Sequence, residues 1–406
     1  MGFLQKKNIF MLKIEDRKLL SAFVFMAVLL VYTVSMMMTN ANVYQDIDVL
    51  RHLLVRIGWG CVIVAVLNII FLQDYSIGEM IAIVLLSVLL YISYKNSGNR
   101  YLCQSFIIAV SARDTNWRQA LHLSLWTHVA MLAIYKLMEM LGIGTVHIFN
   151  RADGTPRYMM GTASPNVLGG YCLVIVLIWI ALRFKKWRWF DYLGCAAIGA
   201  FVWVYPNSKT SVLLIGLALV LTLFFKLFGK KIIDLDIIRL LLIGLYPFCA
   251  FFTFIISYKY DPENRISQLL DRFLNLRVSY GKFFLDQYPH TWWGQRIQMV
   301  SNIQAEQTGQ QMIWLDSIYL RLYISMGIIA TIIAIVLWCM TVWYALKMRD
   351  FGILTGVIVM AIYGISAASV TYIHWNVFLI VLGYIRGTSR TRSYKVYERT
   401  KNKWES

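Results

Sequence analysis

Six basic residues stand in polar segments that interrupt long apolar runs of the chain, and their side chains are suited to binding anions. They are Arg151, Arg157, Lys209, Arg265, Arg272 and Arg277. A guanidinium is a planar fork of donors that matches phosphate oxygens. The set therefore predicts a site for an anionic headgroup, such as a lipid-linked pyrophosphate. The alternative is that these residues pair with phospholipid or with carboxylates of the same segments.

A carboxylate and a tyrosine follow the last of these polar segments. Asp316 opens the next apolar run, and Tyr319 shares its helix face. The carboxylate could act as a general base or hold a sugar hydroxyl. It could equally cap the helix N-terminus, the commoner role of Asp at such a position. His290 is a second candidate for the base.

Metal-ligand patterns are weak in this sequence. Asp46-Ile47-Asp48 is a single D-x-D triplet that could hold a cation. His122 and His128 are six residues apart and point to different helix faces. The six cysteines lie in apolar runs and form no C-x-x-C pair, which argues against a zinc site or a disulfide framework. No P-loop, dinucleotide-binding glycine motif or nucleophile elbow is present. We therefore predict no metal and no cofactor.

The elements that position these residues are predicted to be membrane-spanning helices. Hydrophobic residues make up 59% of the 406 and charged residues only 15%, against about a quarter in a soluble domain. Many apolar runs are long enough to cross about 30 Å of hydrocarbon. We predict an all-α polytopic membrane protein with about 12 transmembrane helices, near residues 18–38, 53–73, 79–94, 101–112, 119–143, 166–184, 189–205, 211–228, 239–258, 315–346, 351–371 and 373–387.

The net charge of +18 could suggest a nucleic-acid partner, but the basic residues gather before the first apolar run and after the last. This placement is typical of cytoplasmic anchors that face anionic lipid. We therefore predict cytoplasmic N- and C-termini and no nucleic acid. The segments 144–165, 205–211 and 259–314 then face the outside, and Lys95 and Arg100 are exceptions to the charge bias.

One large loop stands out from an otherwise continuous membrane domain. No internal repeat or soluble domain is present, so we predict a single integral membrane domain, 1–406, with an extracytoplasmic loop at 259–314. Apolar residues recur every three or four positions over 265–277, which indicates an amphipathic helix. Such a helix could lie on the membrane surface or cap a cavity. The alternative is an ordinary solvated helix.

Three segments of the chain carry motifs. They are Arg157-Tyr-Met-Met-Gly161-Thr-Ala-Ser-Pro165-Asn166, then Asn207-Ser208-Lys209-Thr210, then Arg277 through Pro289 and Gly294 followed by Asp316-Ser-Ile-Tyr319-Leu320. In this order they resemble the O-antigen polymerase and ligase family, closest to the Wzy-type polymerases of capsular polysaccharide and exopolysaccharide. The resemblance covers most of the chain through topology and about forty residues through motifs. Lysine replaces the family's arginine in the second motif, and its phenylalanine is missing from the first.

The resemblance implies a GT-C-like glycosyltransferase of the bacterial cytoplasmic membrane. It implies that undecaprenyl-pyrophosphate-linked repeat units are joined on the outer leaflet by inverting transfer, without metal. Asp316 would be the base, and Arg157 and Arg277 would stabilise the departing pyrophosphate. The residues expected to bind substrate are Arg151, Asn166, Lys209, Arg265, Arg272, His290 and Tyr319. Partners would be the lipid-linked donor and acceptor, the lipid bilayer, a flippase and a chain-length regulator.

Two other functions stay open at this point. A ligase would move finished glycan to another acceptor with the same donor chemistry, but the family's ligases carry a His-Asn pair where Asp316-Ser317 stands here. A flippase or transporter of lipid-linked oligosaccharide should show repeats and paired broken helices with charges near the middle of the membrane.

Overall fold

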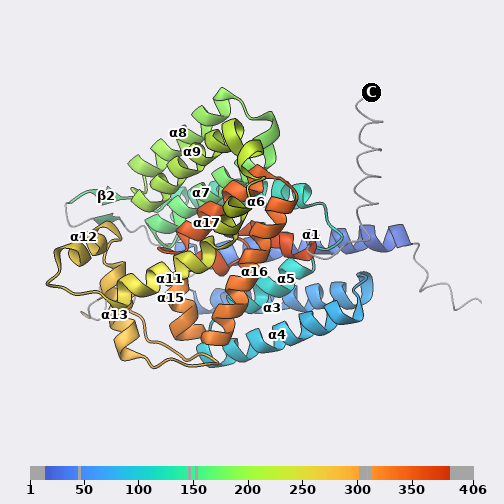
Figure 1. Cartoon of the computed structure of the whole chain (residues 1–406), viewed down its shortest axis with the longest axis horizontal. Coiled ribbons are helices and arrows are strands. Elements are labelled where there is room, and N and C mark those ends of the chain that lie inside the picture. The colour runs from blue at the N-terminus through green and yellow to red at the C-terminus, as the bar shows by residue number, and fades with distance from the viewer. Residues whose placement is uncertain are drawn as a thin grey trace, which may run out of the picture.

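The computed structural model describes residues 14–43, 47–144, 148–150, 154–300, 309 and 312–384. Within these residues the regular secondary structure is almost all helix (Figure 1), and the expected all-α membrane architecture is confirmed. The strands described are two residues long each, β1 (Phe149–Asn150) and β2 (Pro156–Arg157), and they pair antiparallel. The helices are α1 (Ile14–Met38), α3 (Asp48–Leu67), the π-helix η2 (Asn68–Leu72), α4 (Ile77–Ser97), α5 (Tyr101–Val110), α6 (Trp117–Met140), α7 (Pro165–Arg183), the 3-10 helix η3 (Phe184–Lys186), α8 (Trp189–Val204), α9 (Lys209–Ile232), α10 (Asp236–Ile243), α11 (Leu245–Tyr258), α12 (Arg265–Phe273), α13 (Arg277–Gln287), α15 (Ile318–Arg321), the π-helix η4 (Leu322–Met326), α16 (Ile328–Lys347), α17 (Phe351–Tyr363) and the 3-10 helices η5 (Ala368–Thr371) and η6 (Val377–Tyr384).

Six of the described helices are long and apolar enough to cross a membrane, and a bent pair brings the number to seven. The six are Ile14–Met38, His52–Leu72, Ile77–Ser97, Pro165–Lys186, Lys209–Ile232 and Ile328–Lys347. The pair is α10 and α11, which meet at 50°. Several of the other expected spans are shorter elements: α5, α8 and α17 have 10, 16 and 13 residues, and the run 373–387 holds only η6 among its described residues. The protein is therefore a multi-pass membrane protein whose helices differ widely in length.

Burial separates a central helix from peripheral ones. In its most apolar stretch α7 is 72% buried inside the protein, whereas the same measure for α4 is 11%. α7 packs against α6, α8, α9 and α17. Many apolar side chains of α4 are exposed, among them Ile81, Leu85 and Val88, as expected where lipid and not water is the solvent, whereas Leu90 is buried. Both helices begin at a serine N-cap, Ser76 for α4 and Ser164 for α7, whose side-chain oxygen accepts a backbone N–H.

The expected single span over 315–346 is wrong, because the chain breaks at Gly327. Gly294 and Gly327 both have φ of +92°, and their backbones cross so closely that a Cβ on Gly327 would lie 2.4 Å from the Gly294 nitrogen. The Gln295 N–H donates to the Ser325 carbonyl at 2.7 Å, and the Ile328 N–H donates to the Thr291 carbonyl at 3.0 Å. The segment after α13 is therefore fastened to the junction between η4 and α16. α15 and η4 form a short separate piece ahead of α16.

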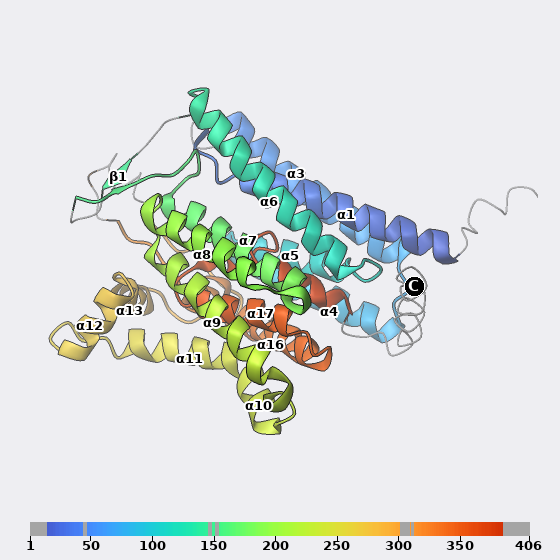
Figure 2. The ribbon, with the colours of Figure 1, turned by 90° about the horizontal axis from the view of Figure 1, so that it is seen from above.

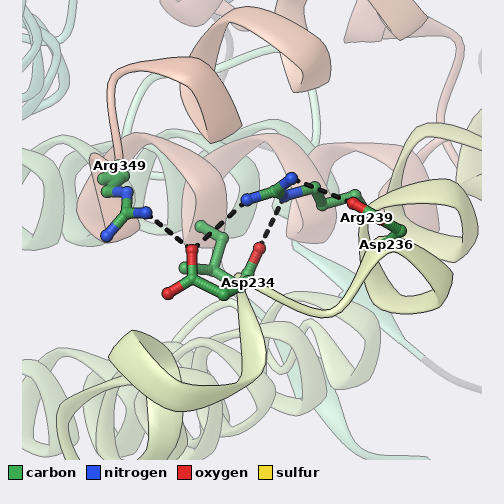
Figure 3. A network of polar contacts seen from close by, with 5 residues as sticks. Asp234, Asp236, Arg239 and Arg349 are labelled. Carbon is green, nitrogen blue, oxygen red and sulfur yellow. Dashed lines mark hydrogen bonds and ion pairs between the residues drawn. The ribbon is translucent and has the colours of Figure 1, made fainter.

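The two ends of the helix bundle differ (Figures 1 and 2). α12, α13 and the β1–β2 hairpin lie at one end, which we call the loop end, and α1 begins at the opposite end. At the opposite end, Asp234 joins two turns of the chain (Figure 3). Its Oδ1 pairs with Arg349 at 2.6 Å and with Arg239 at 3.3 Å, and Arg239 also pairs with Asp236 at 3.0 Å. These groups are exposed, and exposed pairs contribute about 0–1 kcal/mol each, so they orient the α9–α10 and α16–α17 turns more than they stabilise them.

Candidate active site at the loop end

An ion pair between Arg277 and Asp316 forms the centre of the candidate site. Arg277 Nη2 lies 3.0 Å from Asp316 Oδ2, although the two residues are far apart in sequence. The side chain of Arg277 is 13% exposed and that of Asp316 is 32% exposed, so the pair is partly accessible and not deep in the protein. Arg277 Nη1 also donates to the Leu274 carbonyl at 3.0 Å. Nη1 of the guanidinium is thus held by the Leu274 carbonyl, and Nη2 is held by the Asp316 carboxylate.

Arg277 is placed by a sharp elbow between α12 and α13. The amphipathic helix expected over 265–277 is correct for α12 but ends at Phe273, since Asn275 and Leu276 have positive φ values of 53° and 64°. Asp271, which is buried, accepts the N–H groups of Val278 and Ser279 at 3.0 and 2.9 Å. These donors belong to the first turn of α13, so the Asp271 carboxylate satisfies them as a capping side chain does.

A glycine lets α13 lie directly on its neighbours. A Cβ at Gly281 would lie 2.4 Å from Ser257 Oγ of α11 and 2.7 Å from Leu320 Cδ1 of α15. Gly281 and Arg277 are four residues apart, and therefore on the same face of α13. This close contact holds Arg277 against the start of α15, where Asp316 stands.

Asp316 does not cap α15, and that interpretation is wrong. The N-cap of α15 is Ser317, without a side-chain capping bond, and the Ile318 N–H donates instead to the Gly364 carbonyl at 2.9 Å. Burial raises the pKa of the Asp316 carboxyl above its ordinary value, and the positive charges of Arg277 and Arg321 oppose that shift. A carboxyl with a raised pKa is a stronger base than an ordinary one.

A second polar group at the loop end contains Arg157 and Asn166. Arg157 Nη2 donates to Asn166 Oδ1 at 2.7 Å, and Nε donates to the Pro206 carbonyl at 3.1 Å. Lys209, three residues beyond Pro206, is the exposed first residue of α9. The first and second sequence motifs therefore meet in space, and the guanidinium of Arg157 is engaged by protein groups.

The remaining predicted residues do not join the ion pair in the contacts described. Arg265 and Arg272 are exposed on α12, and the exposed His290 packs on the Tyr323 ring with centroids 5.0 Å apart. Tyr319 is buried and donates its hydroxyl to the Ala361 carbonyl at 2.6 Å. Arg151, Asp46 and the side chain of Asp48 lie outside the described part. Among the residues that are described, no three His, Cys, Asp or Glu side chains gather as metal ligands would.

Three residues near the ion pair were missed in the sequence. Asp271 sits within an apparently regular helical stripe, so nothing marked it as the cap of the next helix. Arg321 acts electrostatically on Asp316 and lies over the Trp314 ring at 5.7 Å, although a spacing of five residues would place the two on different faces of one continuous helix. Tyr363, at the end of α17, is within electrostatic reach of both Arg277 and Asp316. Only Arg321 could have been found, as a charge beside the candidate base.

The arrangement can bind an anion and accept a proton at adjacent points. Arg277 and Arg321 supply guanidinium donors, and Asp316 is a carboxylate with a raised pKa beside them. An anion that takes Arg277 from Asp316 would remove the carboxylate's nearest cation and raise its pKa further. Comparison of the chain with family models, with curated proteins and with solved structures finds no match.

Proposed function

We propose that the protein is a glycosyltransferase that joins undecaprenyl-pyrophosphate-linked oligosaccharide repeat units at the outer face of the bacterial cytoplasmic membrane. The observation that supports this is the Arg277–Asp316 pair, a phosphate-binding group beside a basic carboxylate, at the end of a membrane bundle. A lipid-linked pyrophosphate sugar requires both chemistries together, and it requires them at the membrane surface. We extend the proposal to a GT-C-like arrangement of about twelve passes with both termini cytoplasmic.

In the proposed reaction, a hydroxyl of the incoming repeat unit attacks the anomeric carbon of the growing chain. The new carbon–oxygen bond forms as the bond to pyrophosphate breaks, and the pyrophosphate leaves with the electron pair. The hydroxyl proton passes to Asp316. Arg277, aided by Arg321, stabilises the charge on the leaving pyrophosphate, and fixed cations do this without reorganising. One displacement of this kind inverts the anomeric centre.

Purified protein in nanodiscs should be given lipid-linked repeat units without added metal, and the products read as a ladder and by mass. A ladder that steps by one repeat unit supports the polymerase. Transfer to a different acceptor, without a ladder, supports a ligase. The same preparation with a chelator tests Asp46 and Asp48, since loss of the ladder on chelation would assign a metal.

A transporter of lipid-linked oligosaccharide is the second candidate, because broken helices are a feature of such proteins. α10 and α11 meet at 50°, and Gly327 separates η4 from α16. Substrate that binds but gives neither ladder nor transfer, and that crosses the bilayer of reconstituted vesicles, would favour this function over the enzyme.

A further inference from the structure

A pocket of about 240 Å³ opens at the loop end, away from the ion pair. A cavity of only about 10–15 Å³ can hold a single ordered water, so this pocket has room for a larger ligand. Figure 2 shows the β1–β2 hairpin and the α12–α13 segment on opposite sides of this end of the bundle. Its lining comes from the chain after α1, the end of α6, the segment after β2 and the end of α8, and includes Asn42, Glu139, Tyr158, Met159, Gly161 and Tyr205.

Stacked aromatic rings form one wall of this pocket. Tyr158 stacks on Tyr205 with centroids 5.0 Å apart and 26° between the ring planes, and Tyr205 stacks on Phe201 at 5.3 Å and 15°. The Tyr158 N–H also donates to the Tyr205 carbonyl at 3.1 Å, which holds the first two residues in register. Tyr158 ends the stack and is 36% exposed. A flat ring is therefore held at the pocket with part of its surface accessible.

Charge at the pocket argues against an ionic ligand. Glu139 lines the pocket, and Lys136 Nζ donates to its Oε2 at 3.0 Å, so the pair is locally neutral. The carboxylate repels a phosphate, and the lysine already balances the charge that a cation would meet. The nearby guanidinium of Arg157 is bound to Asn166 and to Pro206. The ligand that fits is neutral and carries hydroxyl donors, which a carboxylate accepts.

We propose that this pocket is a subsite for a neutral sugar ring of the lipid-linked saccharide. The C–H face of the sugar would pack on Tyr158, and a sugar hydroxyl would donate to Glu139. This proposal rests on the proposed function for the source of the sugar, but not for the chemistry of the pocket. The subsite adds a means of choosing the repeat unit, separate from the groups that react.

A row of contacts runs from the subsite to Tyr363, at the end of α17. Asn40, two residues before Asn42, accepts the Ala163 N–H at 2.7 Å and donates its side-chain amide to the Tyr171 hydroxyl at 3.0 Å. The Tyr171 ring lies 4.6 Å from Trp375, and Trp375 lies 6.4 Å from Tyr363. Tyr363 lies within electrostatic range of Arg277 and Asp316, and no direct contact with either is described. A sugar in the pocket therefore lies several side chains away from the reacting anomeric carbon, as a saccharide of more than one ring allows.

The test is saturation-transfer NMR on the full chain in nanodiscs, with methyl glycosides of glucose, galactose, rhamnose and N-acetylglucosamine as probes. At least one glycoside should bind the wild-type protein. Tyr158→Ala should weaken that binding by about two- to tenfold, the range expected for one aromatic contact. Glu139→Gln should weaken it too, and Tyr158→Phe should retain it. Tyr258→Ala is the matched control, because Tyr258 is 58% exposed at the end of α11 and does not line the pocket.

The outcomes separate this proposal from the proposed function. Absence of binding by every probe, or binding unchanged in both Tyr158→Ala and Glu139→Gln, overturns the subsite. Displacement of the glycoside by inorganic pyrophosphate also overturns it, because the pocket would then be an anion site. Glycoside binding that persists in Arg277→Ala, without any ladder from the wild-type protein, leaves the subsite standing and removes the transferase. A ladder from the wild-type protein without glycoside binding supports the transferase and overturns the subsite.

Discussion

Replacement of Arg277 is the most direct test of the candidate active site. Arg277→Ala removes the 3.0 Å contact with Asp316 and the 3.0 Å hydrogen bond to the Leu274 carbonyl. Exposed ion pairs contribute about 0–1 kcal/mol and breaking a buried one costs about 3–5 kcal/mol. Since Asp316 is 32% exposed, we expect an intermediate loss of about 1–3 kcal/mol in folding stability, which leaves the protein folded.

The expected effect on the reaction is much larger than the effect on folding. Loss of one fixed donor to a developing anion costs about 2.7–4 kcal/mol of barrier, or roughly 100- to 1,000-fold in rate. Arg277→Lys should recover part of the rate only, because an ammonium cannot contact Leu274, Asp316 and a phosphate through a planar fork. The assay is the initial rate of ladder formation in nanodiscs, at matched protein amounts judged by size-exclusion profile and Tm.

Lys282→Ala supplies the control for this experiment. Lys282 is a basic residue of the same helix, but it pairs with Asp286 at 2.9 Å. Its loss should change the rate by less than about threefold, since an i,i+4 pair contributes about 0.3–0.5 kcal/mol. An Arg277→Ala protein with normal Tm and a rate within threefold of the wild type would refute the role assigned to the ion pair.

Three more predictions concern groups around this pair. Because burial raises the pKa of Asp316, the reaction rate should begin to fall, as pH decreases, at a pH above the ordinary carboxyl range. Arg277→Lys loses the close contact that lowers this pKa, so the fall should begin at a still higher pH in that variant. A pH–rate profile measures both effects, and Asp316→Asn should abolish the reaction at every pH. Asp271→Ala should lower the free energy of unfolding by about 0.5–2 kcal/mol by removing the acceptor for two N–H groups, as followed by thermal unfolding, and an unchanged Tm would contradict the capping role. Gly281→Ala should lower the free energy of unfolding by about 1–3 kcal/mol, because its Cβ would clash with Ser257, and Ser257→Gly in the same protein should restore part of that loss. A double variant no more stable than Gly281→Ala alone would count against this packing.

The sequence predicted the helices well where apolar runs were long and uninterrupted. The run at 166–184 became α7 almost residue for residue, since a serine cap and Pro165 mark its start. The run at 315–346 was predicted as one span because its apolar content is continuous across Gly327. The break there depends on a crossing with Gly294, a long-range contact that hydropathy cannot show.

The candidate site was predictable in its residue types but not in its pairings. Arg277 and Asp316 were chosen separately, one as an anion ligand and the other as a base or a cap, and the structure brings them into contact. Tyr319 was expected to share a face with Asp316, yet its hydroxyl is bound inside the bundle, because α15 begins only at Ile318 and turns the side chain toward α17. The elbow at Asn275 and Leu276 separates Arg277 from the helix that holds Arg272, which periodicity alone could not locate.

The deep burial of α7 has a consequence for biogenesis. α6, α8 and α9 reach the membrane soon before or after α7 during synthesis, but α17 follows only after more than 160 further residues. Until then, the face of α7 that α17 later covers must be held by lipid or by insertion machinery. Because α7 is strongly apolar, its uncovered face can stay in contact with lipid until α17 is inserted. A nascent chain arrested before residue 351 should therefore contain a correctly inserted α7 that quality-control proteases still recognise as unassembled.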